Sequence, residues 1–320
     1  MASTSLSTPL PLPPPHPPTS SALALAHLTQ EEHDALQAAV FQRLHPRLYL
    51  ERYVSERVRP DARLFGEGRG VSVDVGSIST ADGSALVRMG ETTVVCGVKA
   101  EIAEPELDRE SLGFLVPNLD LTAMCSPKFK PGPPTEEAQV LSDRLNHALI
   151  TSNFVSLESL CIHPGKAVWV LYVDATCVNY DGNAFDATLL AMVAALRNTT
   201  LPQATYDPET NRTVCSRRLP RVPLQLAKST PISTSFGIFD SKYVLLDPTA
   251  FEEPLLDTSL SIVLGDEGDI VSVAQVGSLV VSVSEGEGEG GEEVRKDVLA
   301  ECIASAKLRR AEVVDALNVT

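Results

Sequence analysis

The sequence predicts an α+β protein built from two mixed halves of sheet and helix. In residues 71–100 apolar side chains recur at every second position between tight turns, which is typical of antiparallel strands. Residues 185–196 are apolar on nearly every side, which is typical of a helix that is covered on both faces. Strand-like segments return after residue 206. This order of elements indicates the α+β class.

Composition and charge exclude several classes of protein. The chain has 320 residues, long enough for one large or two small domains, and 42 acidic against 26 basic residues, a net charge of −16. This balance excludes a wholly basic nucleic-acid-binding surface but leaves a local basic patch open. No apolar run approaches the roughly 18 residues of a membrane span, and no Lys or Arg precedes Arg43. We therefore expect a soluble, intracellular protein that does not contact membranes.

The six cysteines and six histidines are scattered and form no CxxC or Cys/His cluster. We expect reduced thiols in the core, no metal site and no cofactor.

The N-terminal part divides into a tail and a helical segment. Residues 1–28 are rich in proline and predict a disordered tail, with a peptide ligand for a partner as the alternative. Residues 29–58 predict helix: Thr29 fits a capping position, apolar residues fall on one face, and Pro46 breaks the pattern.

The first half spans residues 59–205. A hairpin turn is expected at 81–84, and Thr135 should cap a helix after the Pro/Gly-rich connection at 127–134. Strands are expected near residues 71–75, 85–89, 93–100 and 166–178.

The second half spans residues 206–320. Residues 285–293 form a Gly/Glu-rich segment that predicts a solvated loop, and a final helix is expected from about 292 to 317. Strands are expected near residues 213–215, 236–239, 242–246, 259–264 and 270–276.

Several short runs together resemble proteins of the RNase PH type. Residues 59–63 (RPDAR) resemble the RPDGR run of that family, with Ala62 in place of glycine. Further similar runs lie, in order, at 83–94, 130–134, 163–166, 180–183 and 247–253. The resemblance covers roughly residues 50–280. It implies the RNase PH-type fold (ribosomal protein S5 domain 2-like), with the two halves defined above.

The resemblance also sets a test for activity. Active members are phosphorolytic 3′-to-5′ exoribonucleases, whose attacking phosphate needs backbone N–H groups at a helix start together with an arginine. Here the corresponding turn is Asp181-Gly182-Asn183, which lacks the arginine. We therefore interpret Asp181, Gly182, Asn183 and Asp257 as vestigial positions in a catalytically inactive chain. Asp181 and Asn183 would then only shape the turn and cap the helix. Glu252, Glu253 and Asp257 would be solvated. The alternative is an active phosphorolytic exoribonuclease that retains Asp257.

Local clusters of basic residues remain candidates for RNA contact. They are Arg59, Arg63 and Arg69 near the start of the first half, and Lys128 and Lys130 in its middle. A solvated or protein-contacting face is the alternative. The acidic loop at 101–110 would repel a phosphate backbone.

The runs at 130–134, 163–166, 180–183 and 247–253 resemble the inactive branch of the family in particular. This resemblance implies a structural role for the chain. Members of that branch are subunits of the ring of the eukaryotic RNA exosome and support 3′-to-5′ RNA processing and decay, including rRNA maturation and mRNA turnover. The implied partners are other RNase PH-like subunits in a hetero-hexameric ring, S1/KH cap subunits, a separate catalytic nuclease, and RNA threaded through the channel. The implied localisation is the nucleus, including the nucleolus, and the cytoplasm.

Overall fold

The computed structural model describes residues 29–216, 219–227, 229–285 and 292–318. The predicted tail at 1–28 lies outside the described residues. The chain divides into two compact units, Met1–Tyr53 and Val54–Thr320. None of the described helices is both long enough and apolar enough to span a bilayer.

The first unit contains helix α2 (Gln30–Leu44) and most of helix α3 (Pro46–Ser55). The predicted break is confirmed, because α3 begins at Pro46, a first-turn position that proline tolerates. Aromatic rings run along these helices: Phe41 lies 6.3 Å from Tyr49, and Tyr49 lies 4.9 Å from Tyr53.

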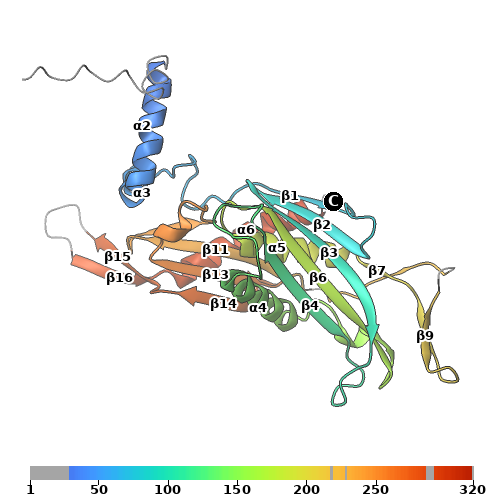
Figure 1. Ribbon diagram of the computed structural model, residues 1–320. Helices are drawn as coiled ribbons and strands as arrows, with labels where there is room; N and C mark the ends of the chain where they lie inside the picture. Colours follow the sequence, from blue (N-terminus) through green and yellow to red (C-terminus); the bar gives the residue numbers. More distant parts are fainter. Residues whose placement is uncertain (1–28, 217–218, 228, 286–291, 319–320) are drawn as a thin grey trace, which may run out of the picture. The chain divides into compact units, whose positions relative to one another are not determined.

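The first sheet of the second unit has the strand order β1-β2-β3-β6-β4, with β5 also paired to β6 (Figure 1). The bounds are β1 Val71–Val75, β2 Gly83–Met89, β3 Thr92–Ala103, β4 Phe114–Leu121, β5 Cys161–His163 and β6 Ala167–Asn179. The antiparallel meander β1-β2-β3 is confirmed, and β4 runs parallel to β6. These long central strands provide the platform for the helix that carries the candidate site.

The predicted turn at 81–84 is wrong, because β2 already begins at Gly83 and the β1–β2 connection is residues 76–82. A Cβ at Gly83 would lie 2.2 Å from the Thr199 hydroxyl and 2.7 Å from the Ala195 carbonyl oxygen. The glycine is therefore required by close helix packing rather than by the turn.

Two helices pack on the first sheet. Helix α4 (Glu136–Thr151) is capped as predicted, since the Thr135 hydroxyl accepts a hydrogen bond from the Ala138 N–H. Helix α5 (Ala184–Arg197) contacts strands of both sheets, and every residue from Ala184 to Leu196 is buried. The prediction of a helix covered on both sides is confirmed.

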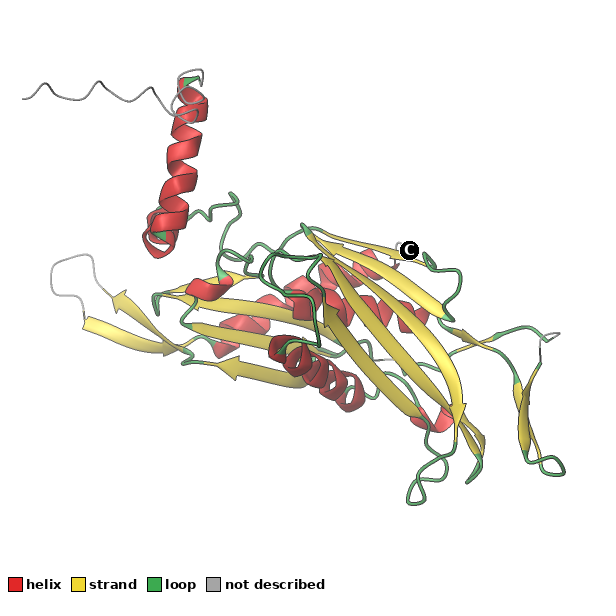
Figure 2. Ribbon diagram, viewed as in Figure 1, coloured by secondary structure: helices red, strands yellow, loops and turns green. Residues whose placement is uncertain are grey.

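The second sheet has the strand order β12-β11-β13-β14, and helix α6 packs against its strands β11 and β13 (Figure 2). The bounds are β11 Ile232–Phe239, β12 Tyr243–Leu246, β13 Thr258–Leu264, β14 Ile270–Val276 and α6 Leu299–Asn318. Short 3₁₀ turns and two-stranded ribbons complete the unit: η1 Leu157–Leu160, η2 Glu253–Leu255, β7 Thr200–Leu201, β10 Val222–Pro223, β8 Ala204–Asp207 and β9 Arg212–Cys215.

The start of the final helix was predicted too early. Residues 292–297 form strand β16 (Glu292–Asp297), which pairs with β15 (Val280–Glu285), and α6 begins only at Leu299. The predicted loop at 285–293 therefore has both ends in strands, and its residues 286–291 lie outside the described part of the chain.

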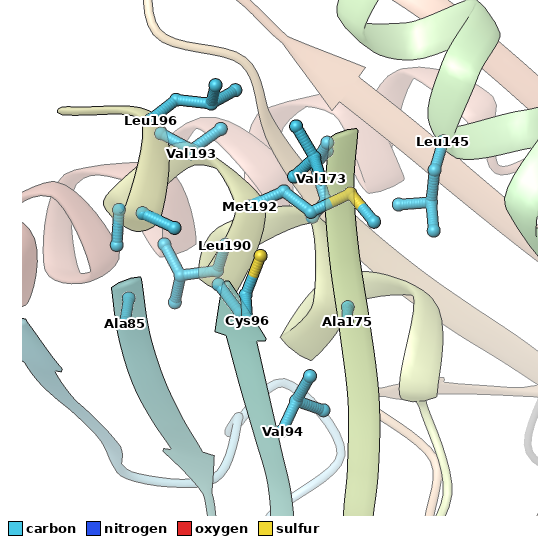
Figure 3. Close-up of a cluster of buried hydrophobic side chains, with 14 of the residues drawn as sticks. Ala85, Val94, Cys96, Leu145, Val173, Ala175, Leu190, Met192, Val193 and Leu196 are labelled. Atoms are coloured by element: carbon cyan, nitrogen blue, oxygen red, sulfur yellow. The ribbon is translucent and has the colours of Figure 1, made fainter. Parts of the chain in front are cut away.

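The core of the second unit lies between the first sheet and α5. Figure 3 shows Leu190 of α5 close to Cys96 of β3, and Met192 beside Val173 of β6. Four of the six cysteines are buried, whereas Cys215 is exposed. Burial of this apolar surface fixes the start of α5 in place.

Candidate functional site

The turn that precedes α5 is held against a second segment of the chain. Gly182 has a φ of +80°, and a Cβ there would lie 2.5 Å from the Ala250 backbone nitrogen. Asn183 follows with a φ of +52° in the left-handed region. Only glycine fits the first position, so the turn and residues 248–250 form one tightly packed unit.

The Asn183 side chain does not cap α5, so that prediction is wrong. Its amide donates to Asp186 Oδ2 at 2.8 Å and to Asp247 Oδ1 at 2.6 Å. Asn183 therefore bridges two buried carboxylates, which needs an amide donor rather than an acceptor.

The N-terminus of α5 is occupied by a carboxylate of the chain itself. Glu253 Oε1 accepts from the Asn183 backbone N–H at 2.7 Å, and its other oxygen accepts from the Tyr180 hydroxyl. Burial raises the pKa of Glu253, although these two hydrogen bonds act in the opposite direction. Glu253 therefore satisfies one of the backbone N–H groups that a helix N-terminus offers to an anion. The prediction that Glu253 is a solvated residue is wrong.

Asp186 adds a second buried acid in the first turn of α5. It accepts from the Ser235 N–H at 2.7 Å and from the Ser235 hydroxyl at 2.9 Å. Burial raises its pKa, and the nearby Asp247 charge acts in the same direction. A phosphate would meet this negative field in addition to Glu253.

Arg69 and Asp247 form a buried bidentate ion pair. Arg69 Nε donates to Asp247 Oδ2 at 2.8 Å, and a terminal nitrogen donates to Oδ1 at 2.7 Å. The same guanidinium donates to the Asp181 carbonyl oxygen at 2.7 Å and so holds the turn. Burial alone would raise the pKa of Asp247, but the hydrogen bonds and charge of Arg69 hold it well below its usual range.

Arg59 and Glu252 form a second buried pair, with side chains 0% and 1% exposed. Arg59 Nε donates to Glu252 Oε1 at 2.9 Å, and the guanidinium also donates to the carbonyl oxygens of Leu246 and Asp247. The predictions of RNA contact at Arg59 and Arg69 are therefore wrong, because carboxylates inside the protein hold both guanidinium groups. The prediction of a solvated Glu252 is wrong for the same reason.

Arg63 lies at the edge of this cluster of buried charges. It donates to Asp61 at 2.6 Å and to the Asp247 carbonyl oxygen at 3.2 Å, and it is 12% exposed. Lys128 is exposed and pairs with Glu137, and Lys130 is exposed, so RNA contact at these residues stays a prediction.

Asp257 is exposed and accepts from the Ser241 N–H at 3.2 Å, while its own N–H donates to Ile238. Ile238 lies three residues beyond Ser235 on β11, or about 10 Å further along the strand. The structure therefore places Asp257 away from the contact between Ser235 and Asp186.

Two comparisons with known proteins decide the family. The model of the 3′ exoribonuclease family, domain 1, matches residues 67–202, and the model of domain 2 of that family matches residues 229–308. The exosome complex component rrp43 of Schizosaccharomyces pombe is 44% identical over 239 residues, which are 75% of this chain and 87% of that protein. The chain belongs to the 3′ exoribonuclease family. The two matched regions fall on either side of residues 203–228, while the division between residues 205 and 206 stays a prediction.

Other relatives of this 3′ exoribonuclease family member come from archaea. The exosome complex component Rrp42 of Methanothermobacter thermautotrophicus is 37% identical over 70% of this chain and 81% of its own length. The structure of the Archaeoglobus fulgidus exosome with RNA bound to the active site contains a chain that is 30% identical, with a TM-score of 0.68. The match covers 83% of this chain and 96% of that one. A chain of the archaeal exosome core gives 26% identity and a TM-score of 0.65, over 87% and 98% of the two chains. The RNase PH-type fold expected from the sequence is confirmed.

The buried pair of Arg69 and Asp247 predicts how acid affects this family member. A carboxyl whose pKa is lowered by folding contributes stability that is fully present above its unfolded pKa of about 3.9, and that is lost as the pH falls through the folded pKa. Asp186 and Glu253, whose pKa values are raised, act in the opposite direction. We expect Asp247→Asn to cost about 2 kcal/mol at pH 7, typical of lost hydrogen bonds to charged groups. At pH 3 the cost should fall only in part, because the folded carboxyl stays ionised well below the pH at which the unfolded one is protonated. Urea unfolding of both proteins at the two pH values measures the difference. A cost that vanished at pH 3 would contradict the pairing.

Proposed function

We propose that this chain is a non-catalytic structural subunit of an RNA exosome ring. The occupation of the α5 N-terminus by Glu253 carries the proposal that the chain is not an enzyme, because a bound carboxylate excludes a second anion by charge and by volume. Membership in the family and the relatives named as exosome components support the ring assembly.

The relatives named as exosome components support an assembly with other exosome subunits. We propose that the partners are other RNase PH-like subunits in a hetero-hexameric ring, S1/KH cap subunits and a separate catalytic nuclease, with RNA threaded through the assembled channel. In this role the chain supports 3′-to-5′ RNA processing and decay without cleaving RNA itself. The proposed localisation, nucleus with nucleolus and cytoplasm, is that of the whole complex.

Native mass spectrometry of the tagged chain purified from its own cells tests the assembly. We expect one particle that contains several different RNase PH-like chains. A monomer or a homo-oligomer would contradict the ring assignment.

The lack of catalysis is tested by phosphorolysis. We expect the purified chain, given poly(A), inorganic phosphate and Mg²⁺, to release no ADP above the background of the Asp257→Asn variant. Turnover that disappears in Asp257→Asn would establish the alternative, an active exoribonuclease that uses this carboxylate.

A further inference from the structure

A cleft of about 810 Å³ opens beside the start of α5 in the second unit. Helix α4 forms one wall, and strands β11 and β13 with residues 248–256 form the other. The volume lies in the range of about 300–1,000 Å³ typical of ligand pockets. The walls are largely apolar, with Val140 and Leu141 on α4 facing Phe236, Pro254 and Leu256.

Among the described residues that line this cleft, Arg144 on α4 is a cation without a carboxylate oxygen within 4.0 Å. Its guanidinium stacks on Phe185, with the central carbon 4.3 Å from the ring centroid. Its Nε is buried and has no hydrogen-bond acceptor among the residues that the structure describes. Burial lowers the pKa of Arg144, and the charge of Asp186 partly opposes this. The Asp186 oxygens already accept hydrogen bonds from Asn183 and Ser235. The buried Arg144 Nε is therefore left without an acceptor, which an anion in the cleft could supply.

The charges around the cleft select the kind of anion. Glu136, Glu137 and Glu253 line it, and Lys128 is paired with Glu137. An RNA strand would bring a negative charge with every nucleotide into this acidic surrounding. A peptide with one acidic side chain among apolar ones brings a single charge to Arg144 and apolar surface to the walls.

We propose that this cleft binds an extended peptide segment of a partner protein, with an aspartate or glutamate of the peptide paired to Arg144. Apolar side chains on both sides of that acid pack against Val140 and Leu256.

The test is a selection of decapeptides from a random phage-displayed library on the purified full-length chain. We expect the selected sequences to carry one acidic residue flanked by apolar residues. A synthetic, fluorescein-labelled copy of a selected peptide should bind Arg144→Gln about tenfold or more weakly than wild type, because a bidentate charged hydrogen bond is lost. Replacing the acidic residue of the peptide by its amide should weaken binding to wild type equally, and should cost little more in Arg144→Gln.

The matched control is Arg212→Gln, an exposed arginine on strand β9 outside the cleft, which should bind as wild type does. Circular dichroism melting verifies that both variants are folded. Selected peptides without an acidic residue, or binding unchanged by Arg144→Gln, would overturn the proposal. So would a labelled A₁₀ oligonucleotide that binds wild type in an Arg144-dependent manner and displaces the peptide, since the anion would then be RNA.

Discussion

Replacing Val193 by aspartate is expected to leave no folded protein at neutral pH. Val193 lies in the middle of α5, is 0% exposed, and points into the core shown in Figure 3. A carboxylate there has neither water nor a cation to replace its hydration. The cost of burying it exceeds about 4 kcal/mol, against a total stability of about 5–15 kcal/mol for a typical domain. Far-UV circular dichroism and size-exclusion chromatography measure the loss.

The same substitution at an exposed valine gives the matched control. Val214 on strand β9 is 61% exposed, and Val214→Asp should shift the urea midpoint only slightly. A cooperative transition of Val193→Asp at the wild-type midpoint would show that α5 is not buried between the two sheets.

The second large effect concerns the buried pair of Arg59 and Glu252. We expect Arg59→Met to lower the free energy of unfolding by about 3–5 kcal/mol, because it leaves the Glu252 carboxylate buried without its cation. It also removes the donors to the carbonyl oxygens of Leu246 and Asp247. Urea unfolding followed by tryptophan fluorescence gives the value.

Two variants identify the cause of that loss. Adding Glu252→Gln to Arg59→Met should restore part of the stability, since the uncompensated charge is gone. Lys128→Met, which breaks the exposed pair with Glu137, should cost at most about 1 kcal/mol. If Arg59→Met cost no more than Lys128→Met, the burial of the pair would be refuted.

Much of the fold follows from local patterns in the sequence. The alternation in residues 71–100 and the all-apolar stretch at 185–196 are set by periodicity, which is a property of each segment alone, and both elements are where periodicity places them. The end of the chain could not be read in this way. The charged run EEVRKD at 292–297 has no apolar stripe, and it becomes a strand only by pairing with β15.

The candidate site was predictable in its location but not in its contacts. The turn at 181–183 is apparent from its glycine and asparagine, but the sequence does not reveal which groups surround it. Arg59 and Glu252 are 193 positions apart, so the segment that carries each counter-ion is known only from the fold. Arginines at 59–69 and acids at 247–253 were visible as opposite charges, which is the signal that could have suggested the pairing. Arg144 offered no such signal, because the sequence does not show that its Nε is buried without a hydrogen-bond acceptor.

The buried ion pairs constrain how the protein is made on the ribosome. Arg59 and Arg69 leave the exit tunnel long before their partners Glu252 and Asp247, which follow them in the chain by 193 and 178 positions respectively. Until then the nascent first half carries two guanidinium groups whose final partners have not been synthesised. Its meander and central helix can form from contacts between nearby residues. The two ion pairs that join the halves can form only after residue 252 has been synthesised, as expected for contacts of high sequence separation. A chain terminated before that point would therefore lack the counter-ions of both arginines and could not form the contacts that join its two halves.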